Sequence, residues 1–465
     1  MRGCRVVAGV PKVKSSTWFA DPFFESPERG SVDGGTTSAG DLWHSVSPRW
    51  GHSMHTMCSY HGMFPAKVAH YFVARYSRPG DLVLDPFSGR GTTALQARVD
   101  GRRALCNDLN PLAYVLSRSK VDPPSWESVN AFADELERTY ASARHRHKEV
   151  SEDIQMLYHD NTLQQLCFVR ERLLSKPIGV WSKEELMVAG SLSGIMHGAW
   201  RRDDTSQYLS ISMPNTFSMS PAYVKKYIYE NGLRKLDQDV FQCLRNKLAR
   251  LYLDDVSGMA GEAFHRDASD LLNGHALKPR SIDLVLTSPP YLRVVNYGTS
   301  NWIRLWLLGI EEVGRERGEG RKRLDKALDH QHTYDSYCDF MLRILLGVER
   351  VLKADGVAVI VIGDVKDPDK NEAVPLAAQV WNDIKHRTSL RLIEIVEDDL
   401  PVQNKVSRIW GETKGQATSR DCALVLTHRD GRPDLRRMEV DWDESYKDGG
   451  PDAAHARLLA ASRSD

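Results

Sequence analysis

One stretch decides how this 465-residue chain folds: Ile282-Asp283-Leu284-Val285-Leu286-Thr287-Ser288-Pro289-Pro290-Tyr291. Its apolar half, residues 282–286, predicts a parallel strand that is buried on both faces. The prolines end that strand, because proline fixes φ and has no N–H to donate to a neighbouring strand. We therefore expect Ser288 and Tyr291 in a stiff loop at the carboxyl end of a strand, the edge where open α/β sheets bind ligands.

The residues of this loop suit chemistry on the amino group of a nucleobase. Such an amino group is a poor nucleophile, because its lone pair is delocalised into the ring. The Ser288 side chain and the Pro289 carbonyl can accept both N–H groups and favour a tetrahedral nitrogen, an interaction that strengthens in the transition state. Tyr291 offers a ring for stacking on a base that has left its duplex. Taken alone, the loop is equally compatible with a proline-terminated strand that has no chemistry.

A second unit, strand then loop then helix, predicts a nucleotide-cofactor site. The strand covers residues 81–85, the loop is Pro86-Phe87-Ser88-Gly89-Arg90-Gly91, and a helix opens at Thr92. Glycines let backbone N–H groups approach a ligand, and a helix N-terminus attracts its anionic part. The third glycine of a dinucleotide fingerprint is missing, which disfavours NAD. Asp108 ends the next predicted strand, where a carboxylate can accept hydrogen bonds from ribose hydroxyls.

Three motifs resemble those of S-adenosylmethionine-dependent DNA amino-methyltransferases: Asp85-Pro86-Phe87-Ser88-Gly89-Arg90-Gly91-Thr92-Thr93, Asp108-Leu109-Asn110-Pro111 and Thr287-Ser288-Pro289-Pro290-Tyr291. The likeness is closest to the cytosine-N4 group, whose catalytic loop carries Ser where many adenine-N6 enzymes carry Asp or Asn. It covers residues 50–120 and 265–430. The catalytic residues that the resemblance implies are Ser288, Pro289, Pro290 and Tyr291. The residues that it implies for binding S-adenosylmethionine are Phe64, Pro65, Asp85, Pro86, Phe87, Gly89, Gly91, Thr92, Thr93, Asp108 and Asp267.

The resemblance also implies an α/β fold, a Rossmann-like methyltransferase sheet of seven strands with a mostly helical insertion. We expect a flexible N-terminal segment over residues 1–45. The first part of the methyltransferase domain, with the cofactor motifs, covers residues 46–120. The helical insertion, a candidate target-recognition region, covers residues 121–260. The second part of the domain, with the catalytic motif, covers residues 261–430, and a polar tail covers residues 431–465.

Two stretches are candidates for contact with nucleic acid. Residues 221–229 interleave aromatic residues with lysines, a pattern suited to stacking and phosphate contact. Residues 315–326 are basic and contain glycine, and we expect a mobile surface loop that contacts phosphates. An ordinary solvated surface is the alternative for both. A polar loop over residues 404–411 is expected to face the target base. The candidate residues for binding nucleic acid are Tyr223, Lys225, Lys226, Arg321, Lys322 and Arg323.

Composition limits the other classes. The 62 basic and 62 acidic residues cancel, so any surface for nucleic acid must be local. The seven cysteines never occur as Cys-x-x-Cys, which favours a reducing compartment. No apolar run reaches the length of a membrane span and no signal peptide is evident, so we predict a cytoplasmic protein with no membrane contact. His52, His55, Cys58 and His61 lie three residues apart, but nothing else supports a metal site and we predict none.

The predicted function is methyl transfer from S-adenosylmethionine to the exocyclic amino group of a flipped base in double-stranded DNA, with cytosine N4 as the first choice. Such an enzyme can accompany a cognate restriction endonuclease. Three alternatives stay open: adenine-N6 methylation of DNA, methylation of an RNA base, and a catalytically idle DNA-binding protein of the same fold. No feature of the sequence fixes an oligomeric state.

Overall fold

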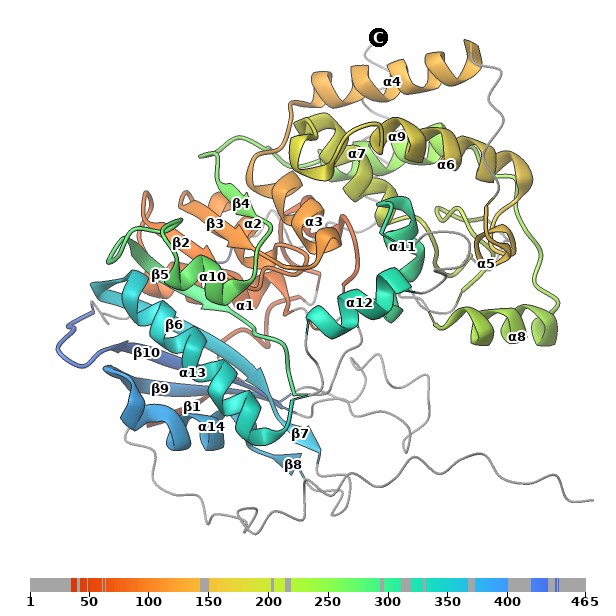
Figure 1. Ribbon diagram of the computed structural model, residues 1–465. Coiled ribbons are helices and arrows are strands. Elements are labelled where there is room, and N and C mark those ends of the chain that lie inside the picture. Colours follow the sequence, from red (N-terminus) through yellow and green to blue (C-terminus); the bar gives the residue numbers. More distant parts are fainter. Residues whose placement is uncertain are drawn as a thin grey trace, which may run out of the picture.

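The computed structural model places most of the chain between residues 35 and 442 (Figure 1). It describes residues 35–39, 42–47, 49–60, 62, 64–142, 150–201, 205–213, 219–292, 297–310, 319–328, 332–366, 373–399, 420–433, 440 and 442. His61 and the predicted loop over residues 404–411 lie outside these ranges.

A sheet of eight strands organises the molecule, in the order β1-β9-β10-β6-β5-β2-β3-β4. Strand β10 is antiparallel to both of its neighbours, and the other pairs are parallel. This order, with helices on both faces, confirms the predicted Rossmann-like methyltransferase fold. The strands of this sheet are β1 (Gly35–Ser38), β2 (Leu82–Asp85), β3 (Arg103–Asn107), β4 (Glu262–Phe264), β5 (Ile282–Thr287), β6 (Leu352–Gly363), β9 (Leu390–Asp399) and β10 (Arg420–His428).

The sheet has one strand more than the predicted seven. Strand β1 comes from the segment before residue 45 and pairs in parallel with β9, Gly35 opposite Glu394. Two features fix it there: the Thr37 hydroxyl donates to Glu394 at 3.0 Å, and Trp43, which is 2% exposed, donates its indole N–H to Asp398 at 3.1 Å. An edge strand that leaves backbone groups unpaired is a template for another strand, and β1 covers the edge of β9. A separate small sheet joins β7 (Val365–Lys366) to β8 (Ala373–Val374).

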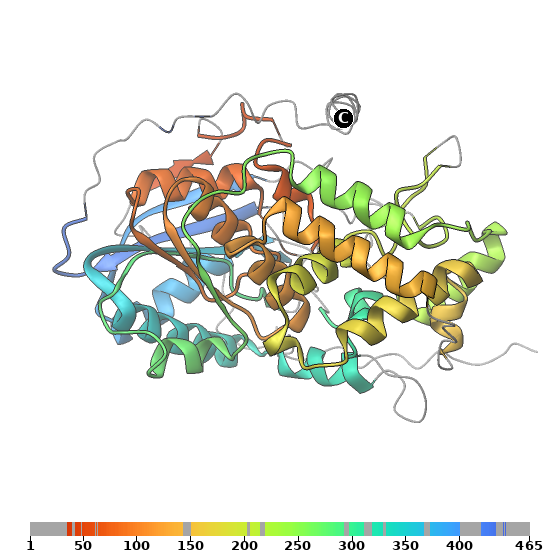
Figure 2. The same cartoon turned by 90° about the horizontal axis from the view of Figure 1, so that it is seen from above.

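Helices cover both faces of the sheet (Figures 1 and 2). One apolar cluster buries side chains of α10, α13 and α14 against one face, and another buries side chains of α1 and α2 against the opposite face. The strands between them read as continuous apolar runs because both of their faces are covered. The helices that flank the sheet are α1 (Ala66–Tyr76), α2 (Thr92–Val99), α3 (Pro111–Val121), α10 (Ala268–Asn273), α13 (Tyr334–Val351) and α14 (Leu376–Ile384).

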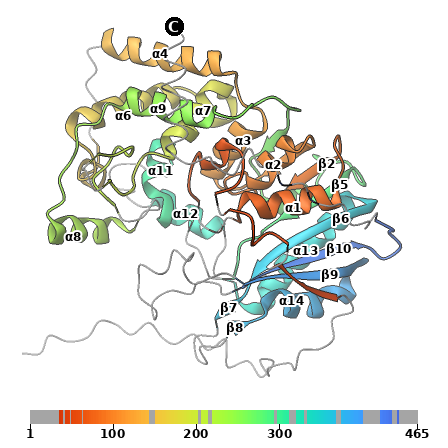
Figure 3. The same ribbon diagram turned by 180° about the vertical axis from the view of Figure 1, so that it is seen from behind.

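The chain between β3 and β4 is helical and packs as a second layer beyond α3 (Figures 1 and 3). Its apolar side chains form one cluster with those of α3 and α11, so the helical region shares a core with the side of the sheet domain. The remaining helices are α4 (Trp126–Ser142), α5 (Glu152–Gln155), α6 (Asp160–Leu173), α7 (Lys183–Ser193), α8 (Pro221–Asn231), α9 (Val240–Leu251), α11 (Trp302–Leu307) and α12 (Glu319–Ala327).

The predicted surface loop over residues 315–326 is wrong from Glu319 onward, because that part forms helix α12. Glu, Arg, Lys and Leu, which fill this segment, are good helix formers. Leu324 is buried in the cluster of the helical region, so the helix also gains from apolar burial. No helix in the described ranges combines the length and the apolar character that a membrane span requires.

Gly347 of α13 sets how closely α13 approaches α10, and both helices border the cavity described below. A β-carbon at Gly347 would lie only 2.5 Å from the β-carbon of Leu272 on α10. We expect Gly347→Ala to lower the free energy of unfolding by about 1–3 kcal/mol, as overpacking does, although alanine favours a helix more than glycine. Urea unfolding measures this effect. In the control Gly179→Ala, nothing lies within 4 Å of the added carbon, and we expect a change within about 0.5 kcal/mol.

Candidate active site

The loop after β2 is held by the carboxylate of Asp108 at the end of β3. An Asp108 oxygen accepts the Gly89 N–H at 2.9 Å, and its other oxygen accepts the Asn110 N–H at 2.8 Å. Burial is the largest effect on this carboxyl and raises its pKa to about 7, although these backbone hydrogen bonds oppose the shift. Gly89 has φ +49°, a conformation that glycine adopts without strain. The two loops that follow β2 and β3 are therefore locked together at one edge of the sheet.

Asp85 ties the loop after β2 to strand β5. One of its oxygens accepts the Thr287 hydroxyl at 2.6 Å and the Phe87 N–H at 3.1 Å. Burial raises the pKa of Asp85 to about 6, and the hydrogen bond from Thr287 opposes the shift. Asp85 does not border the cavity described below, so its contacts give it a positioning role.

Gly91 differs from Gly89 in what surrounds it. It begins helix α2 with φ +77°, and an added β-carbon would lie 3.0 Å from the Ser117 Cα of helix α3. Gly91 therefore allows α2 and α3 to approach each other, whereas Gly89 borders the cavity. Thr92 and Thr93, which follow Gly91, are buried and lie away from the cavity lining.

The loop predicted to be catalytic leaves β5 at Ser288, and Ser288 and Pro290 both line the cavity. Pro289 is buried behind them. The Ser288 hydroxyl donates to the Tyr291 oxygen at 3.2 Å, and the Tyr291 hydroxyl donates to Asp421 at 3.2 Å. Burial raises the pKa of Tyr291 well above its ordinary value, so this side chain stays a phenol. Its ring is absent from the cavity lining.

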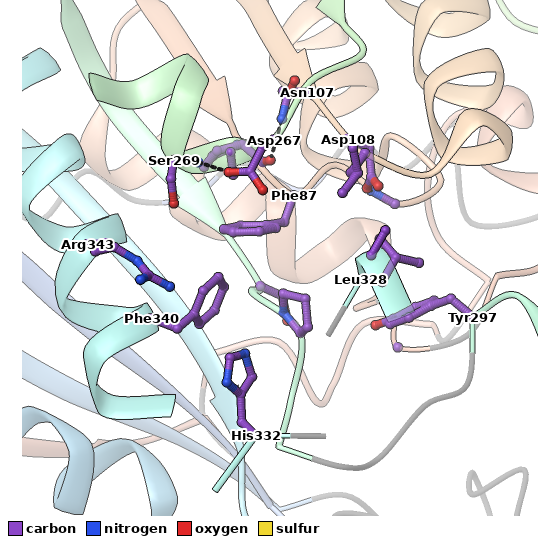
Figure 4. A pocket seen from close by; sticks show the side chains of 18 of the residues that line it. Phe87, Asn107, Asp108, Asp267, Ser269, Tyr297, Leu328, His332, Phe340 and Arg343 are labelled. Carbon is purple, nitrogen blue, oxygen red and sulfur yellow. Dashed lines mark hydrogen bonds between the residues drawn. The ribbon is translucent and has the colours of Figure 1, made fainter. Parts of the chain in front are cut away.

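A cavity of about 230 Å³ lies where these loops meet (Figure 4). Phe87, Gly89 and Asp108 border it from the loops after β2 and β3, and Asp267 borders it from the start of α10. Asp267 caps α10 by accepting the Ser269 N–H at 2.8 Å. Five parts of the predicted site thus meet around one space. They are Pro86 with Phe87, Gly89, Asp108, Asp267, and Ser288 with Pro290.

Phe64 and Pro65 do not border this cavity. Phe64 packs against the apolar cluster on the α1 face, and Pro65 precedes α1. The residues just before them take that place instead: Tyr60 and Gly62 line the cavity. Tyr60 accepts a hydrogen bond from the Asn110 side chain at 2.8 Å.

Aromatic side chains that the motifs did not predict line the rest of the cavity (Figure 4). Tyr297 stacks on Tyr60 with ring centroids 5.9 Å apart. On the other side, Phe340 of α13 meets Phe87 edge to face at 5.9 Å and stacks on His332 at 5.4 Å. No local motif in the sequence marks these positions.

The candidate residues for nucleic acid lie on two separate helices. Tyr223, Lys225 and Lys226 are exposed on α8, where Lys226 forms an ion pair with Glu230 at 3.5 Å. Lys322 and Arg323 are exposed on α12, which also contains Arg321. Helix α12 reaches the cavity through Ala327, its last residue, and Leu328 directly after it also lines the cavity, whereas no residue of α8 does.

The histidine-rich segment before α1 makes protein contacts at each described position. His52 Nε2 lies 2.9 Å from the Asp255 carbonyl, and His55 Nε2 lies 3.1 Å from the Gln96 side chain. Burial lowers the pKa of both histidines. The Cys58 thiol donates to the Ser59 carbonyl at 3.3 Å. Within the described ranges, no group of three or more His, Cys, Asp or Glu side chains is placed to hold a metal ion.

Fold and cavity together define a methyltransferase-like domain whose site lies at the carboxyl edge of its parallel strands. The sequence profile of the family described as DNA methylase (N6_N4_Mtase) matches residues 17–118 and 282–419, more than half of the chain. The chain therefore belongs to this family. The segment between the two matches contains helices α4 to α10 and strand β4.

Individual relatives match over shorter stretches. Type II methyltransferase M.MvaI of Kocuria varians is 21% identical over 226 residues, 44% of this chain and 45% of that protein. Type II methyltransferase M.MjaII of Methanocaldococcus jannaschii is 31% identical over 68 residues, 15% of this chain and 13% of that protein. The chain thus spans less than half the length of these relatives. The rRNA methyltransferase AviRa of Streptomyces viridochromogenes superposes with a TM-score of 0.28 at 13% identity, over 84% of this chain and 93% of AviRa.

The raised pKa of Asp85 predicts a pH-dependent stability. An aspartate ionises near pH 4 in an unfolded chain, whereas Asp85 holds its proton to about pH 6 in the folded protein. The buried charge therefore costs stability above pH 6, and this cost fades as the pH falls toward 4. Asp85→Asn keeps the oxygen that accepts from Thr287 and Phe87 but has no charge.

Between pH 4.5 and 7.5 the free energy of unfolding of the wild type should fall relative to that of Asp85→Asn by about 2 kcal/mol. Urea titrations of both proteins at matched pH values measure the difference. An identical pH dependence of the two proteins would show that Asp85 does not titrate in this range.

Proposed function

We propose that this protein transfers a methyl group from S-adenosylmethionine to the exocyclic amino group of a flipped base in DNA. One observation carries the proposal: in a chain of the DNA methylase family, a single cavity is bordered by the loop after β2, by Asp108 and Asp267, and by Ser288 and Pro290. Methyl transfer requires the cofactor and the base to meet, so the residues predicted to bind the cofactor and those of the Ser288 loop must border the same space.

The lining fits S-adenosylmethionine by its chemistry. Gly89 borders the cavity without a side chain, which suits close approach of the cofactor to the backbone, and the Asp108 carboxylate suits its ribose hydroxyls. Phe87 and Phe340 offer apolar faces for the adenine, and Asp267 offers an acceptor for the adenine amino group. When bound, S-adenosylmethionine supplies an electrophilic methyl group on a sulfonium.

The catalytic loop supplies acceptors for the target amino group. The Ser288 oxygen and the Pro289 carbonyl accept its two N–H groups and favour a tetrahedral nitrogen whose lone pair is available for attack. Orientation contributes much of the rate, because the nitrogen must approach the methyl carbon in line with the bond that breaks. The proton can leave after the nitrogen has become cationic, so the loop needs no strong base. Tyr60 and Tyr297 provide an aromatic wall against which a flipped base can stack.

Cytosine N4 is the proposed target atom. The support is the neutral, short Ser288 at the position where the resemblance places Asp or Asn in many adenine-N6 enzymes. Adenine N6 is the second candidate. Because both relatives are named Type II methyltransferases, we also propose that the protein works beside a cognate restriction endonuclease.

The test is nucleoside analysis of unmethylated DNA after incubation with the protein and methyl-labelled S-adenosylmethionine. We expect N4-methylcytosine, and Ser288→Ala should lower the rate by about 10²–10³-fold, as the loss of one transition-state hydrogen bond does elsewhere. N6-methyladenine as the sole product would overturn the cytosine assignment and keep the enzyme class. Label in RNA and not in DNA would overturn the DNA substrate.

DNA is proposed to lie across α12 and α8, with the helical region between β3 and β4 as the recognition region. Helix α12 borders both the cavity and a neighbouring groove that includes Arg323, so a strand that enters the cavity passes this helix. Helix α8 presents exposed lysines and the stacked rings of Tyr223 and Tyr227, whose centroids are 6.2 Å apart.

Neutralising one phosphate contact should weaken binding to every DNA sequence alike. For Arg323→Gln, and for Lys225→Gln, we expect the slope of log affinity against log salt to become shallower by about one. Fluorescence anisotropy with a labelled duplex at several salt concentrations measures the slope. Lys278→Gln, an exposed lysine between α10 and β5, is the matched control and should leave the slope unchanged. If both Arg323→Gln and Lys225→Gln showed the wild-type slope, α12 and α8 would not belong to the DNA interface.

A further inference from the structure

We propose that Asp421 is a positioning residue for methyl transfer. Asp421 accepts a hydrogen bond from the Tyr291 hydroxyl, and the Tyr291 oxygen in turn accepts the hydrogen of Ser288. The Ser288 oxygen can then act toward the substrate only as a hydrogen-bond acceptor. This inference rests on the function proposed above, and it assigns a role to a residue outside every motif of the sequence analysis.

The three residues form one line of hydrogen bonds from the cavity into the protein. The Ser288 hydroxyl donates to the Tyr291 oxygen at 3.2 Å, and the Tyr291 hydroxyl donates to an Asp421 oxygen at 3.2 Å. Ser288 borders the cavity, whereas Tyr291 and Asp421 are absent from its lining. The line therefore begins at the cavity and ends outside its lining.

The fold brings Asp421 to this place although it lies 130 residues from Tyr291. Strand β10 is antiparallel to its neighbours, so its first residues lie at the same edge as the carboxyl ends of the parallel strands. Asp421 pairs with Gly363 at the end of β6 and with Asp398 near the end of β9. Its position is set by the backbone ladder on both sides.

The direction of the two hydrogen bonds follows from the chemistry of their ends. An ionised carboxylate can only accept, so Tyr291 must donate to Asp421. The phenol oxygen then has free lone pairs and no hydrogen, so Ser288 must donate to Tyr291. A serine hydroxyl can otherwise donate or accept, and a donor would oppose an incoming N–H group. Because its hydrogen is already donated to Tyr291, the Ser288 oxygen can only accept a hydrogen bond. An amino group on a substrate needs such an acceptor, whereas a carbonyl oxygen would need a donor.

Charged neighbours of Asp421 do not neutralise it. Arg420 on the same strand forms ion pairs with Asp399 at 2.7 Å and Glu397 at 3.1 Å, and neither includes Asp421. The groups that face Asp421 from other elements are Asp398 on β9 and Asp364 after β6. Within the described residues, no cation forms an ion pair with Asp421, and burial raises its pKa to about 6. A partly buried carboxylate that accepts from a tyrosine hydroxyl and has no cationic partner is costly to keep ionised, which favours a use for its charge.

Tyr291→Phe and Asp421→Asn break the line at two points and leave the aromatic ring and the strand pairing in place. In steady-state assays with DNA and S-adenosylmethionine, each substitution should lower kcat by about 10- to 100-fold, the range for loss of a hydrogen bond to a charged group. KM for DNA and the dissociation constant of the cofactor should change little. The double variant should be no slower than the slower single variant, because the line is broken once.

The pH profile separates this role from a structural one. The ratio of the wild-type kcat to that of Asp421→Asn should fall as the pH drops through about 6, where Asp421 gains a proton. Asp85 and Asp108, whose pKa values are also raised, are common to both proteins and cancel in this ratio. Asp399→Asn is the matched control: it removes an exposed carboxylate of the neighbouring strand and should leave kcat and its pH dependence unchanged. Multiplicative losses in the double variant, or wild-type kcat in folded Tyr291→Phe, would overturn the proposal while the proposed function stands.

A spectroscopic readout judges the hydrogen bonds without any turnover. In protein labelled with ¹³Cζ-tyrosine, the Tyr291 resonance, assigned by its loss in Tyr291→Phe, should shift as the pH passes through about 6. The shift should be missing in Asp421→Asn. A resonance that is indifferent to pH in the wild type would overturn the line of hydrogen bonds, even if the protein methylated no DNA and the proposed function failed.

Discussion

The hydrogen bond between Asp85 and Thr287, 2.6 Å long and buried, is the contact on which the site depends. It joins two residues that lie 202 positions apart, at the carboxyl ends of β2 and β5. The ladder between these strands is short, since it pairs only Val83 with Leu284 and Leu84 with Val285. Directly beyond it the chain enters the two loops that border the cavity. The relative position of the two loops is therefore set by the Asp85 carboxylate as much as by the backbone pairing of β2 with β5.

The helical region is fastened to the same edge by a second buried side chain. Arg304 of α11 is 1% exposed and donates to the carbonyls of Ser193 and Ser59, at 3.0 Å each. Ser193 ends α7, and Ser59 directly precedes Tyr60 of the cavity wall. A guanidinium satisfied by carbonyls from two segments fixes their spacing, because its donors have a rigid planar geometry. The helical region between β3 and β4 therefore also helps to position Tyr60 in the cavity wall.

Local patterns in the sequence were sufficient for strands β2 and β5 and for the loops that follow them. The apolar run before Ser288 and the glycine loop before Thr92 each contain their own start and stop signals, so the fold class and the part of the cavity lining that these two loops supply were predictable. Contacts between segments far apart in the sequence were not predictable from local patterns. Gly91 reads as a cradle glycine but packs against Ser117, and Phe64 reads as a cofactor contact but packs on the α1 face. Strand β1 and helix α12 were missed because tertiary burial, at Trp43 and Leu324, decides their structure.

The contact of Asp421 with Tyr291 is another long-range contact that local sequence patterns do not predict. It also offers a physical reason for a short, neutral side chain at position 288. A carboxylate at position 288 would place a charge directly against the target amino group and the cofactor. Here the nearest carboxylate of that line stands two hydrogen bonds away, at the start of the antiparallel strand β10. Hydrogen bonds in such a chain polarise one another. The proposed site therefore combines a neutral side chain at the base with a charge held behind it, and the antiparallel direction of β10 is what brings that charge to the edge where Ser288 lies.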